Sequence, residues 1–344
     1  MNIDEKYIYR CIELASKAKG DTYPNPMVGA VIVHCGKIIG EGYHKKAGQP
    51  HAEINAIASV QDKSLLSEST IYVSLEPCSH FGKTPPCALE LRVLNFKKVV
   101  IGTMDTNEKV SGRGKRILEE AGIEVVSDIL GKECRELNKR FFTFHEKKRP
   151  YIILKWTESA DGFLDKDFQP TQISNALASQ WVHKMRSEEH AILVGTKTAL
   201  NDNPSLTTRH YKGRNPIRIL VDYDLKVPVD FNIYDDASDT IIINSHKDDI
   251  QNLGRVKNVF VRAYRDSGVL GMMEVLYKQQ IQSLIVEGGR FTLQEFLAAG
   301  LWDEMVVIRN KNLMLGSGTP VPRIEAVPQE IKTIGDNEIA FYYQ

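Results

Sequence analysis

The sequence predicts two α/β domains in series, each with a β-sheet covered by helices. Three observations support this prediction. The chain has 344 residues, enough for two or three domains of ordinary size. Short apolar segments alternate with segments of helical periodicity along both halves, which is typical of α/β layered domains. The charged segment His145-Glu-Lys-Lys-Arg-Pro150 interrupts this alternation and predicts a solvated linker between a domain of residues 1–146 and one of residues 147–344.

The first half begins with a predicted helix that Asp4 can cap and that Gly20 can end. A strand hairpin follows, in which VGAVIVH and KIIGEGYH are joined at Cys35-Gly36. A second helix starts near His51. The further predicted elements are a buried strand over 70–76, a helix over 88–96, a strand over 97–105, a helix over 114–122 and a strand over 123–129.

The second half contains strands in which successive residues are nearly all apolar. They are YIILKW, AILVGT, RILVDY, TIIINS, NVFVR, SLIVEGG and EMVVIR. Such segments indicate strands covered on both faces, and therefore a mostly parallel sheet with helices on each side. At least two helices separate them, ALASQWVHKMRSEE and LQEFLAAG. Thr292 and Glu295 have the spacing of a capping box at the start of the second one.

Charge and hydropathy exclude several classes of partner. Lysine and arginine number 44 and aspartate and glutamate also 44, so the net charge of zero gives no general attraction to nucleic acid or to acidic membranes. The chain begins MNIDEKYIYR, without the basic and apolar regions of a signal peptide. No segment approaches the roughly 18 apolar residues of a membrane span. We therefore expect a cytoplasmic protein that binds neither nucleic acid nor membranes.

The cysteines point to thiolate–metal chemistry in the first domain. There are five, all within the first 134 residues: Cys11, Cys35, Cys78, Cys87 and Cys134. An odd number without a secretion signal favours reduced thiols over a disulfide framework. Cys11 falls on the apolar face of the first helix, Cys35 in a turn and Cys134 in a late helix, so these three are predicted to be structural.

The other two cysteines belong with a histidine and a glutamate. His51, Cys78 and Cys87 form a common donor set for catalytic zinc, whose fourth position stays open for water. Bound zinc lowers the pKa of that water towards ~7. Glu53, two residues after His51, is placed to move protons between the water and a substrate. The pattern therefore predicts hydrolytic zinc chemistry with Glu53 as the catalytic residue.

Two non-catalytic interpretations stay open at this point. A structural zinc site needs four protein ligands, and His80 or His44 could supply the fourth. A zinc-stabilised binding module is a related possibility. It predicts that Glu53→Gln leaves function intact, whereas a catalytic site predicts loss of activity with zinc retained.

The same residues also carry a family resemblance. His51-Ala-Glu53 and Pro77-Cys78 match the signature of zinc-dependent nucleobase deaminases, except that eight residues instead of two separate Cys78 from Cys87. PNPMVGAVIV, GYHKKAGQPHAE and EPCSHFGKTPPC resemble the deaminase half of the bifunctional riboflavin-biosynthesis deaminase–reductases. The resemblance implies a cytidine-deaminase-like α/β/α fold. It also implies substrate contacts, from Asn25 to the pyrimidine and from His44, with a loop lining the pocket or meeting the phosphate at His80, Lys83 and Thr84.

The second half has no GxGxxG sequence, but Leu284-Ile-Val-Glu287-Gly-Gly-Arg290 is a strand followed by two glycines and a helix. Such a turn can bring backbone N–H groups close to a phosphate. Three further segments resemble the reductase half of the same family: Lys155 to Gly162, Arg186 to Gly195 and Thr198 to Arg209. The resemblance implies a fold similar to dihydrofolate reductase.

That resemblance also implies the residues of a second site. The predicted NADPH contacts are Ser159, Thr198, Asp202, Gly288, Gly289 and Arg290. The predicted ribotide contacts are Arg186, Leu206, Arg209 and Glu287. Arginines suit a phosphate and a carboxylate suits ribose hydroxyls. Ala160 and Gln172 depart from the family pattern, at positions where leucine and an aromatic residue are usual.

Together the resemblances imply a bifunctional enzyme with Zn²⁺ and NADPH. The first domain would deaminate 2,5-diamino-6-(5-phosphoribosylamino)pyrimidin-4(3H)-one, and the second would reduce its ribosyl group to ribityl. They further imply a homodimer packed through the reductase domains. Two alternatives remain: a zinc deaminase that acts on a base in nucleic acid, with a C-terminal domain that is not an active reductase, or a chain in which only one half is active. No acid–base residue of the reductase is identified.

Overall fold

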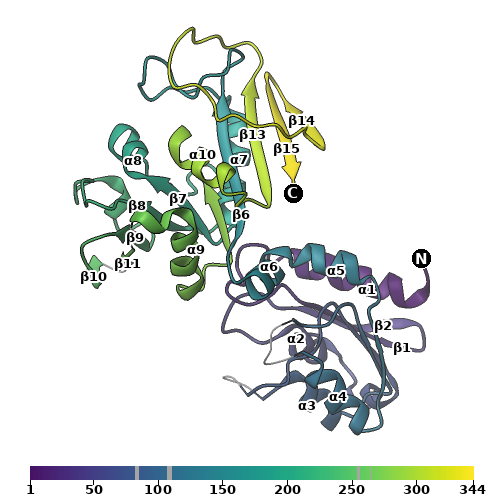
Figure 1. Cartoon of the computed structure of the whole chain (residues 1–344). Coiled ribbons are helices and arrows are strands. Elements are labelled where there is room, and N and C mark those ends of the chain that lie inside the picture. Colours follow the sequence, from purple (N-terminus) through teal and green to yellow (C-terminus); the bar gives the residue numbers. More distant parts are fainter. Residues whose placement is uncertain (82–84, 107–110, 254–255, 264) are drawn as a thin grey trace. The chain divides into compact units, whose positions relative to one another are not determined.

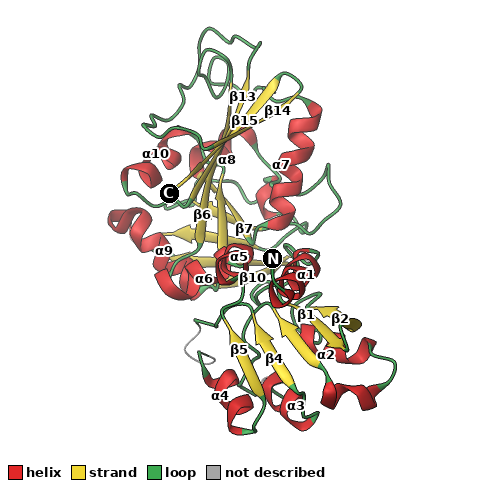
Figure 2. Ribbon diagram, turned by 90° about the vertical axis from the view of Figure 1, so that its right-hand side faces the viewer, coloured by secondary structure: helices red, strands yellow, loops and turns green. Residues whose placement is uncertain are grey.

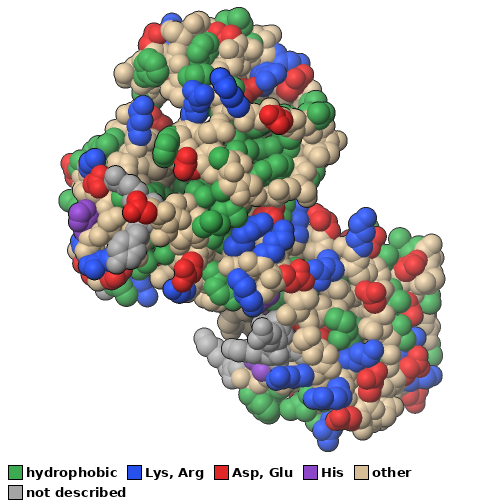
Figure 3. Space-filling view, in the orientation of Figure 1, with side chains coloured by type: hydrophobic (Ala, Val, Ile, Leu, Met, Phe, Trp, Pro, Cys, Tyr) green, Lys and Arg blue, Asp and Glu red, His purple; other side chains and the backbone are tan. Residues whose placement is uncertain are grey.

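The computed structural model describes residues 1–81, 85–106, 111–253, 256–263 and 265–344. These residues form two compact units, Met1–Lys147 and Lys148–Gln344 (Figure 1). The predicted linker over residues 145–150 is wrong in its first half, because the last helix of the first unit continues through Lys147. Among the described residues, no helix is both long enough and apolar enough to cross a membrane. On the face shown in Figure 3, basic and acidic side chains are interspersed.

The first unit is built on a five-stranded sheet of order β2-β1-β3-β4-β5. The strands are β1 (Gly29–His34), β2 (Lys37–Tyr43), β3 (Thr70–Val73), β4 (Lys98–Ile101) and β5 (Glu124–Ser127). The helices are α1 (Ile3–Ser16), α2 (Ala52–Ser59), α3 (Cys87–Val93), α4 (Arg113–Glu120), α5 (Gly131–Leu137) and α6 (Lys139–Lys147), with a 3-10 helix at Lys63–Glu68. Strand β1 runs antiparallel to β2 and β3, and β3, β4 and β5 run parallel.

Helices cover both faces of this sheet (Figure 2). Alternate residues of β1 point in opposite directions, as the strand period requires. Ala30 and Ile32 pack in one apolar cluster with α2, α3 and α4, while Val31 and Val33 pack with α1 and α5 on the other face. This three-layered arrangement confirms the predicted α/β/α fold.

The first helix begins differently from the prediction. Asn2 is the N-cap, and its side chain accepts the backbone N–H of Glu5 at 2.9 Å while the Glu5 carboxylate accepts the N–H of Asn2 at 2.7 Å. The predicted cap at Asp4 is wrong, because Glu5 stands three residues after Asn2 and completes a capping box there. Asp4 instead accepts a hydrogen bond from Tyr72 at 2.8 Å.

The second unit is built on a ten-stranded sheet of order β10-β11-β9-β8-β7-β12-β6-β13-β15-β14. The strands are β6 (Tyr151–Glu158), β7 (Ala191–Gly195), β8 (Ile217–Val221), β9 (Thr240–Asn244), β10 (Asp249–Leu253), β11 (Val256–Arg262), β12 (Ser283–Val286), β13 (Glu304–Asn310), β14 (Glu330–Ile334) and β15 (Asn337–Tyr343). The helices are α7 (Ala176–Glu188), α8 (Thr196–Asp202), α9 (Gly268–Lys278) and α10 (Arg290–Ala298), with 3-10 helices at Asn232–Tyr234 and Arg265–Ser267. Every pairing from β11 to β13 is parallel, and the outer pairings at both edges are antiparallel.

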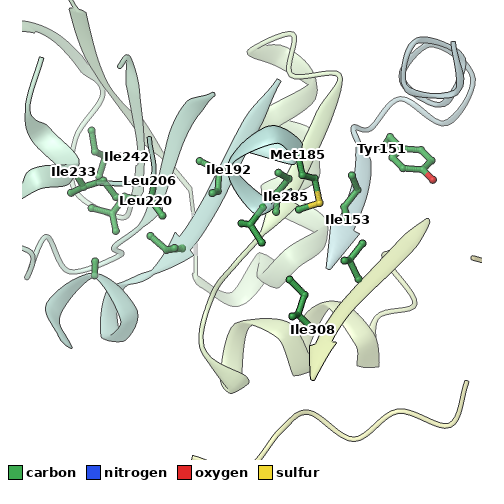
Figure 4. Packing of buried hydrophobic residues seen from close by; sticks show 14 of the residues in the cluster. Tyr151, Ile153, Met185, Ile192, Leu206, Leu220, Ile233, Ile242, Ile285 and Ile308 are labelled. Atoms are coloured by element: carbon green, nitrogen blue, oxygen red, sulfur yellow. The ribbon is translucent and has the colours of Figure 1, made fainter. Parts of the chain in front are cut away.

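Apolar clusters on both faces confirm the predicted doubly covered, mostly parallel sheet. Ile153, Ile192 and Ile285 from three adjacent strands pack with α7 and α8 (Figure 4). The residues that follow or precede them in the strands, such as Ile152 and Leu284, pack with α9 and α10 on the opposite face. Burial on both faces explains why these strands have no polar alternation in the sequence.

The connections mark the carboxyl ends of β7 and β12, in the middle of the sheet, as a candidate ligand-binding region. Neighbouring strands β7 and β12 run parallel, yet the chain leaves β7 for α8 on one face and leaves β12 for α10 on the other. Ligands in α/β proteins commonly bind at the carboxyl ends of two such strands.

The predicted capping box before α10 is wrong: the helix begins at Arg290 with Gly289 as N-cap, so Thr292 lies inside its first turn.

Candidate active sites

The three predicted zinc ligands converge in the first unit. His51 is the N-cap of α2, Cys87 is the first residue of α3, and Cys78 lies between β3 and α3. His51 Nδ1 is 3.5 Å from Cys78 Sγ and 3.4 Å from Cys87 Sγ. Tetrahedral zinc with ordinary bond lengths separates a nitrogen and a sulfur ligand by roughly 3.6 Å. Both nitrogen–sulfur spacings therefore fit a zinc ion, and all three donor atoms lie within 4.8 Å of one another.

The site favours thiolate at Cys78. The backbone N–H of Cys87, at the start of α3, donates to Cys78 Sγ at 3.2 Å. Hydrogen bonds from the Cys87 and His51 side chains lower the pKa of Cys78 to about 4, although burial opposes them. The pKa of Cys87 is raised, because its side chain donates to Cys78 and is itself buried. A thiolate is the form that binds metal.

Glu53 lies in the first turn of α2 and is only 3% exposed. Burial raises its pKa to about 7, and the Cys78 thiolate adds to this, while His51 lowers it. A carboxyl group with such a pKa can both accept and release a proton near neutral pH. Glu53 makes no contribution to the cluster of metal donors, which contains His51, Cys78 and Cys87.

A structural zinc site would need a fourth protein ligand, and the described residues place none beside the other three. The donor cluster there has three members, and His80 is exposed on the loop that follows Cys78. His44 is buried, and its ring meets the ring of His51 edge-on at 5.4 Å, but both of its nitrogens face other partners. Burial lowers the pKa of His44. The predicted loop residues Lys83 and Thr84 lie outside the described residues.

Glu76, for which the sequence predicts no role, anchors the metal-binding segment. Its carboxylate accepts four backbone N–H groups at 2.9 to 3.3 Å, those of Asp105, Gly112, Gly114 and Lys115. It thus satisfies free donors at the start of α4. A Cβ at Gly114 would lie 2.1 Å from the Pro77 carbonyl oxygen, so α4 packs directly against the Cys78 segment. The only sequence indication was an acidic residue before Pro-Cys.

In the second unit, a buried group of charges lies at the carboxyl end of β12. Glu287 receives a bidentate contact from Arg186, at 3.2 and 2.6 Å, and its Oε1 lies 3.8 Å from Lys155 Nζ. Burial alone would raise the pKa of Glu287, but Arg186 and Lys155 outweigh it and lower the pKa to about 2. Burial lowers the pKa of Lys155, and Glu287 opposes this. Lys155 has no role predicted from the sequence, where the available indication is a lysine inside the apolar segment YIILKW.

The two predicted ribotide arginines meet at Thr207. Arg186 Nη1 donates to the Thr207 carbonyl oxygen at 3.3 Å, and Arg209 Nη1 donates to Thr207 Oγ1 at 3.2 Å. Leu206 has a left-handed backbone with φ of 54°. Its side chain is buried in the cluster between the sheet and α7 (Figure 4). Only the main chain of Leu206 is therefore available to a ligand.

Most of the predicted cofactor residues surround the ends of β7 and β12. Thr198 Oγ1 accepts the N–H of Gly289 at 2.8 Å and so joins the two loops. A Cβ at Gly288 would lie 2.8 Å from the Thr292 side chain, so glycine allows close packing there. Arg290 begins α10 and is partly exposed. Asp202 ends α8; desolvation and the neighbouring Asp165 raise its pKa.

Ser159 lies in a different environment. It is completely buried, and its hydroxyl donates to Asp161 at 2.6 Å and accepts the N–H of Phe163 at 3.0 Å. Asp161 in turn accepts the N–H groups of Leu315 and Gly316. Ser159 therefore holds two loops together through Asp161.

Comparisons with known proteins match both units. Residues 1–103 match the family described as the cytidine and deoxycytidylate deaminase zinc-binding region, and residues 150–334 match the RibD C-terminal domain. The chain is 36% identical to the riboflavin biosynthesis protein RibD of Aquifex aeolicus, over 99% of this chain and 98% of the relative. It is also 36% identical to RibD of Escherichia coli, over 88% and 86% of the two chains. A crystal structure from Thermotoga maritima, described as a diaminohydroxyphosphoribosylaminopyrimidine deaminase/5-amino-6-(5-phosphoribosylamino)uracil reductase, superposes with a TM-score of 0.87 at 33% identity, covering 98% of this chain and 97% of the other.

Proposed function

The chain belongs to the RibD family of bifunctional riboflavin-biosynthesis enzymes, and on this premise we propose the role of each site. It is a zinc-dependent deaminase and a reductase. The deaminase converts 2,5-diamino-6-(5-phosphoribosylamino)pyrimidin-4(3H)-one, and reduction of the ribosyl group then gives 5-amino-6-(5-phosphoribitylamino)uracil. We assign deamination to residues 1–146 and reduction to residues 147–344.

The observation that supports the first assignment is the open donor set beside a buried carboxyl group. His51, Cys78 and Cys87 would hold the zinc ion. When bound, the metal supplies a water molecule of lowered pKa at an open position. With zinc bound, Glu53 would take one proton from the water that adds to the amine-bearing carbon and pass it to the ring nitrogen. It would then carry the proton of the added hydroxyl to the departing amino group, so that the carbonyl forms and ammonia leaves. Asn25 binds the pyrimidine ring.

We propose NADPH as the reductant, bound where β7 and β12 end. Thr198, Gly288, Gly289 and Arg290 lie at the diverging loops, and the start of α10 offers N–H groups to a phosphate. Asp202 and the main chain near Ser159 complete the predicted contacts. NADPH would supply a hydride to C1′ of the ribose, and the ring oxygen released from C1′ would take up a proton, which opens the sugar to the ribityl chain.

The charged residues around Glu287 are assigned to different parts of the ribotide. Arg186 is already committed to Glu287 and Thr207, whereas Arg209 is exposed. We therefore assign the phosphate chiefly to Arg209 and the sugar hydroxyls to Glu287, which Arg186 orients. Lys155 lies beside Glu287 with a lowered pKa and is the candidate to move a proton on the sugar. Leu206 contributes its main chain.

Partners and location are proposals as well. Family resemblance supports a homodimer formed through the reductase units. The five cysteines are all free, which is typical of a reducing compartment such as the cytoplasm. The rival function, deamination of a base in nucleic acid, calls for a basic channel with stacking aromatic residues. The net charge of zero and the matched reductase family favour the free ribotide instead.

The test uses the purified zinc-loaded protein and the diaminopyrimidinone ribotide. Ammonia release is followed first without cofactor, and NADPH oxidation is followed after NADPH is added. Ammonia followed by NADPH oxidation is the expected result. Ammonia without NADPH oxidation would restrict the function to the first unit and implicate the departures at Ala160 and Gln172. No ammonia would contradict the assigned deaminase substrate.

A further inference from the structure

The imidazole of His44 has no polar atom left for a ligand. Its Nδ1 lies 3.1 Å from the carbonyl oxygen of Pro50, and its Nε2 lies 3.1 Å from the side-chain nitrogen of Asn25. The residue is 2% exposed. A direct hydrogen bond from His44 to the pyrimidine would therefore require one of these two contacts to break.

These contacts fix the orientation of the Asn25 amide. A carbonyl oxygen only accepts hydrogen bonds, so Nδ1 carries the proton and donates to Pro50. The amide nitrogen of Asn25, which can only donate, lies 3.1 Å from Nε2, so Nε2 accepts and the ring is the neutral form protonated at Nδ1. Because the nitrogen and oxygen of an amide lie at opposite corners of one plane, Asn25 Oδ1 points away from His44. Within the described residues, this oxygen has no hydrogen-bond partner.

We propose that His44 is a positioning residue that turns the acceptor oxygen of Asn25 towards an N–H of the pyrimidine. The inference rests on the proposed deaminase function, and it replaces the predicted substrate contact of His44 by an indirect role. Pro50, which holds the imidazole, immediately precedes the zinc ligand His51. Hydrogen bonds that join the His44 ring to the Pro50 carbonyl and to the Asn25 amide therefore fix the amide relative to the zinc ligand His51.

This arrangement selects a chemical class of ring. A pyrimidine that presents an amino group or a ring N–H to Asn25 gains a hydrogen bond. A ring that presents only a lone pair at that position would place two acceptors against each other, which a site built to accept a proton rejects strongly.

The decisive variants are His44→Phe and its combination with Asn25→Asp. Phenylalanine keeps the ring volume beside His51 but has no nitrogen, and the Pro50 oxygen keeps its second donor, Asn55 Nδ2 at 3.2 Å. The freed amide can flip, so we expect kcat/KM for ammonia release to fall about 10- to 100-fold, mainly through KM. A carboxylate presents an oxygen whichever way it lies. Adding Asn25→Asp should therefore restore at least about 5-fold of the activity that His44→Phe loses.

Two controls are measured on the same preparations. Zinc content reports the metal site, and NADPH oxidation with the already deaminated ribotide reports the second unit. Full activity in His44→Phe, or no recovery with Asn25→Asp, would overturn the positioning role. A wild-type protein that releases no ammonia would overturn the proposed function and this inference with it. If His44→Phe loses its zinc, the single variants Asn25→Asp and Asn25→Leu are compared with His44 in place. The inference requires Asn25→Asp to release ammonia much faster than Asn25→Leu, and equal losses would contradict it.

Discussion

At the scale of single residues, both sites depend on charged groups that the fold removes from water. Glu53 and Glu287 are both buried carboxyl groups, yet their pKa values move in opposite directions, to about 7 and about 2. The difference lies in their neighbours: a thiolate beside Glu53, and Arg186 and Lys155 beside Glu287. The same residue type is thereby suited to proton transfer in one site and to constant negative charge in the other.

Replacing Glu53 by glutamine tests the catalytic interpretation of the zinc site. Glutamine has the same shape but cannot carry the proton, so we expect ammonia release to fall by about 10²- to 10⁴-fold. Zinc content, measured by atomic absorption, should stay at the wild-type value because Glu53 is not among the donors. Ammonia release at the wild-type rate would instead support a zinc-stabilised binding module.

His190, at the start of β7, predicts how the second unit responds to acid. Burial lowers its pKa to about 3, with Arg214 adding to the effect and Glu189 opposing it. The unfolded state then binds the proton first, so the free energy of unfolding should fall as the pH drops from about 6.5 towards 3, by at most about 1.4 kcal/mol per pH unit from this group. His190→Gln, which keeps an acceptor for the N–H of Gln282, should make that fall shallower.

The measurement is urea unfolding followed by tryptophan fluorescence between pH 7.5 and 4. All three tryptophans, Trp156, Trp181 and Trp302, lie in the second unit, so the signal reports that unit alone. Equal slopes of stability against pH in the two proteins would show that His190 is not the responsible group.

At the scale of elements, close packing of helices on strands places the site residues. Helix α2 carries Glu53 in its first turn and lies directly on β2. A Cβ at Gly42 would lie 2.3 Å from the backbone nitrogen of Ala56 and 2.6 Å from the carbonyl oxygen of Ala52. Helix backbone cannot yield locally, so any side chain at this position must displace the whole helix.

Gly42→Ala is therefore expected to destabilise the first unit by about 1–3 kcal/mol and to weaken zinc binding. Zinc content after dialysis and the rate of ammonia release should both fall, while NADPH oxidation with the deaminated ribotide should not change. Ile38→Ala is the matched control, because Ile38 lies on the same strand and is 45% exposed. Similar losses in both variants would mean that the strand, and not its contact with α2, is what matters.

At the scale of the whole molecule, the described residues form two units with separate apolar clusters. The second unit contains a fully buried arginine, Arg218, around the start of β8. It donates five hydrogen bonds, to the carboxylate and the carbonyl oxygen of Asp235 and to Asn232, Ser238 and Thr240. Removing it leaves several carbonyl oxygens without donors, which is costly inside a protein.

Arg218→Met should destabilise the second unit by on the order of 3 kcal/mol and leave the first unit unchanged. On heating, NADPH oxidation and tryptophan fluorescence should be lost at a lower temperature than in the wild type, while the temperature at which ammonia release is lost should not shift. Lys226→Met, which removes an exposed ion pair with Asp224, is the control and should change stability by less than about 1 kcal/mol. Loss of both activities at one temperature would show that the units unfold together.

The sequence alone was sufficient for the family, the two α/β folds, the doubly covered sheet and the residue types of the zinc site. These follow from local patterns: apolar strands, helical periodicity, and ligands at set spacings. The sequence was insufficient where the tertiary structure determines which residue caps a helix and where a helix begins or ends. The N-cap of α1 is Asn2 and not the predicted Asp4, α10 begins before Thr292, and α6 extends into the predicted linker.

Only the tertiary structure decided which groups are buried together. No local pattern shows that Glu76 holds the start of α4, that Arg186 and Lys155 lower the pKa of Glu287, or that His44 faces Asn25 and Pro50. Each of these contacts joins segments distant in the chain or turned towards each other by a loop. Their energies depend on desolvation and on distances of a few ångströms, which are set by packing. Composition and spacing therefore determined which chemical groups are available, and burial determined which of them lie together at each candidate site.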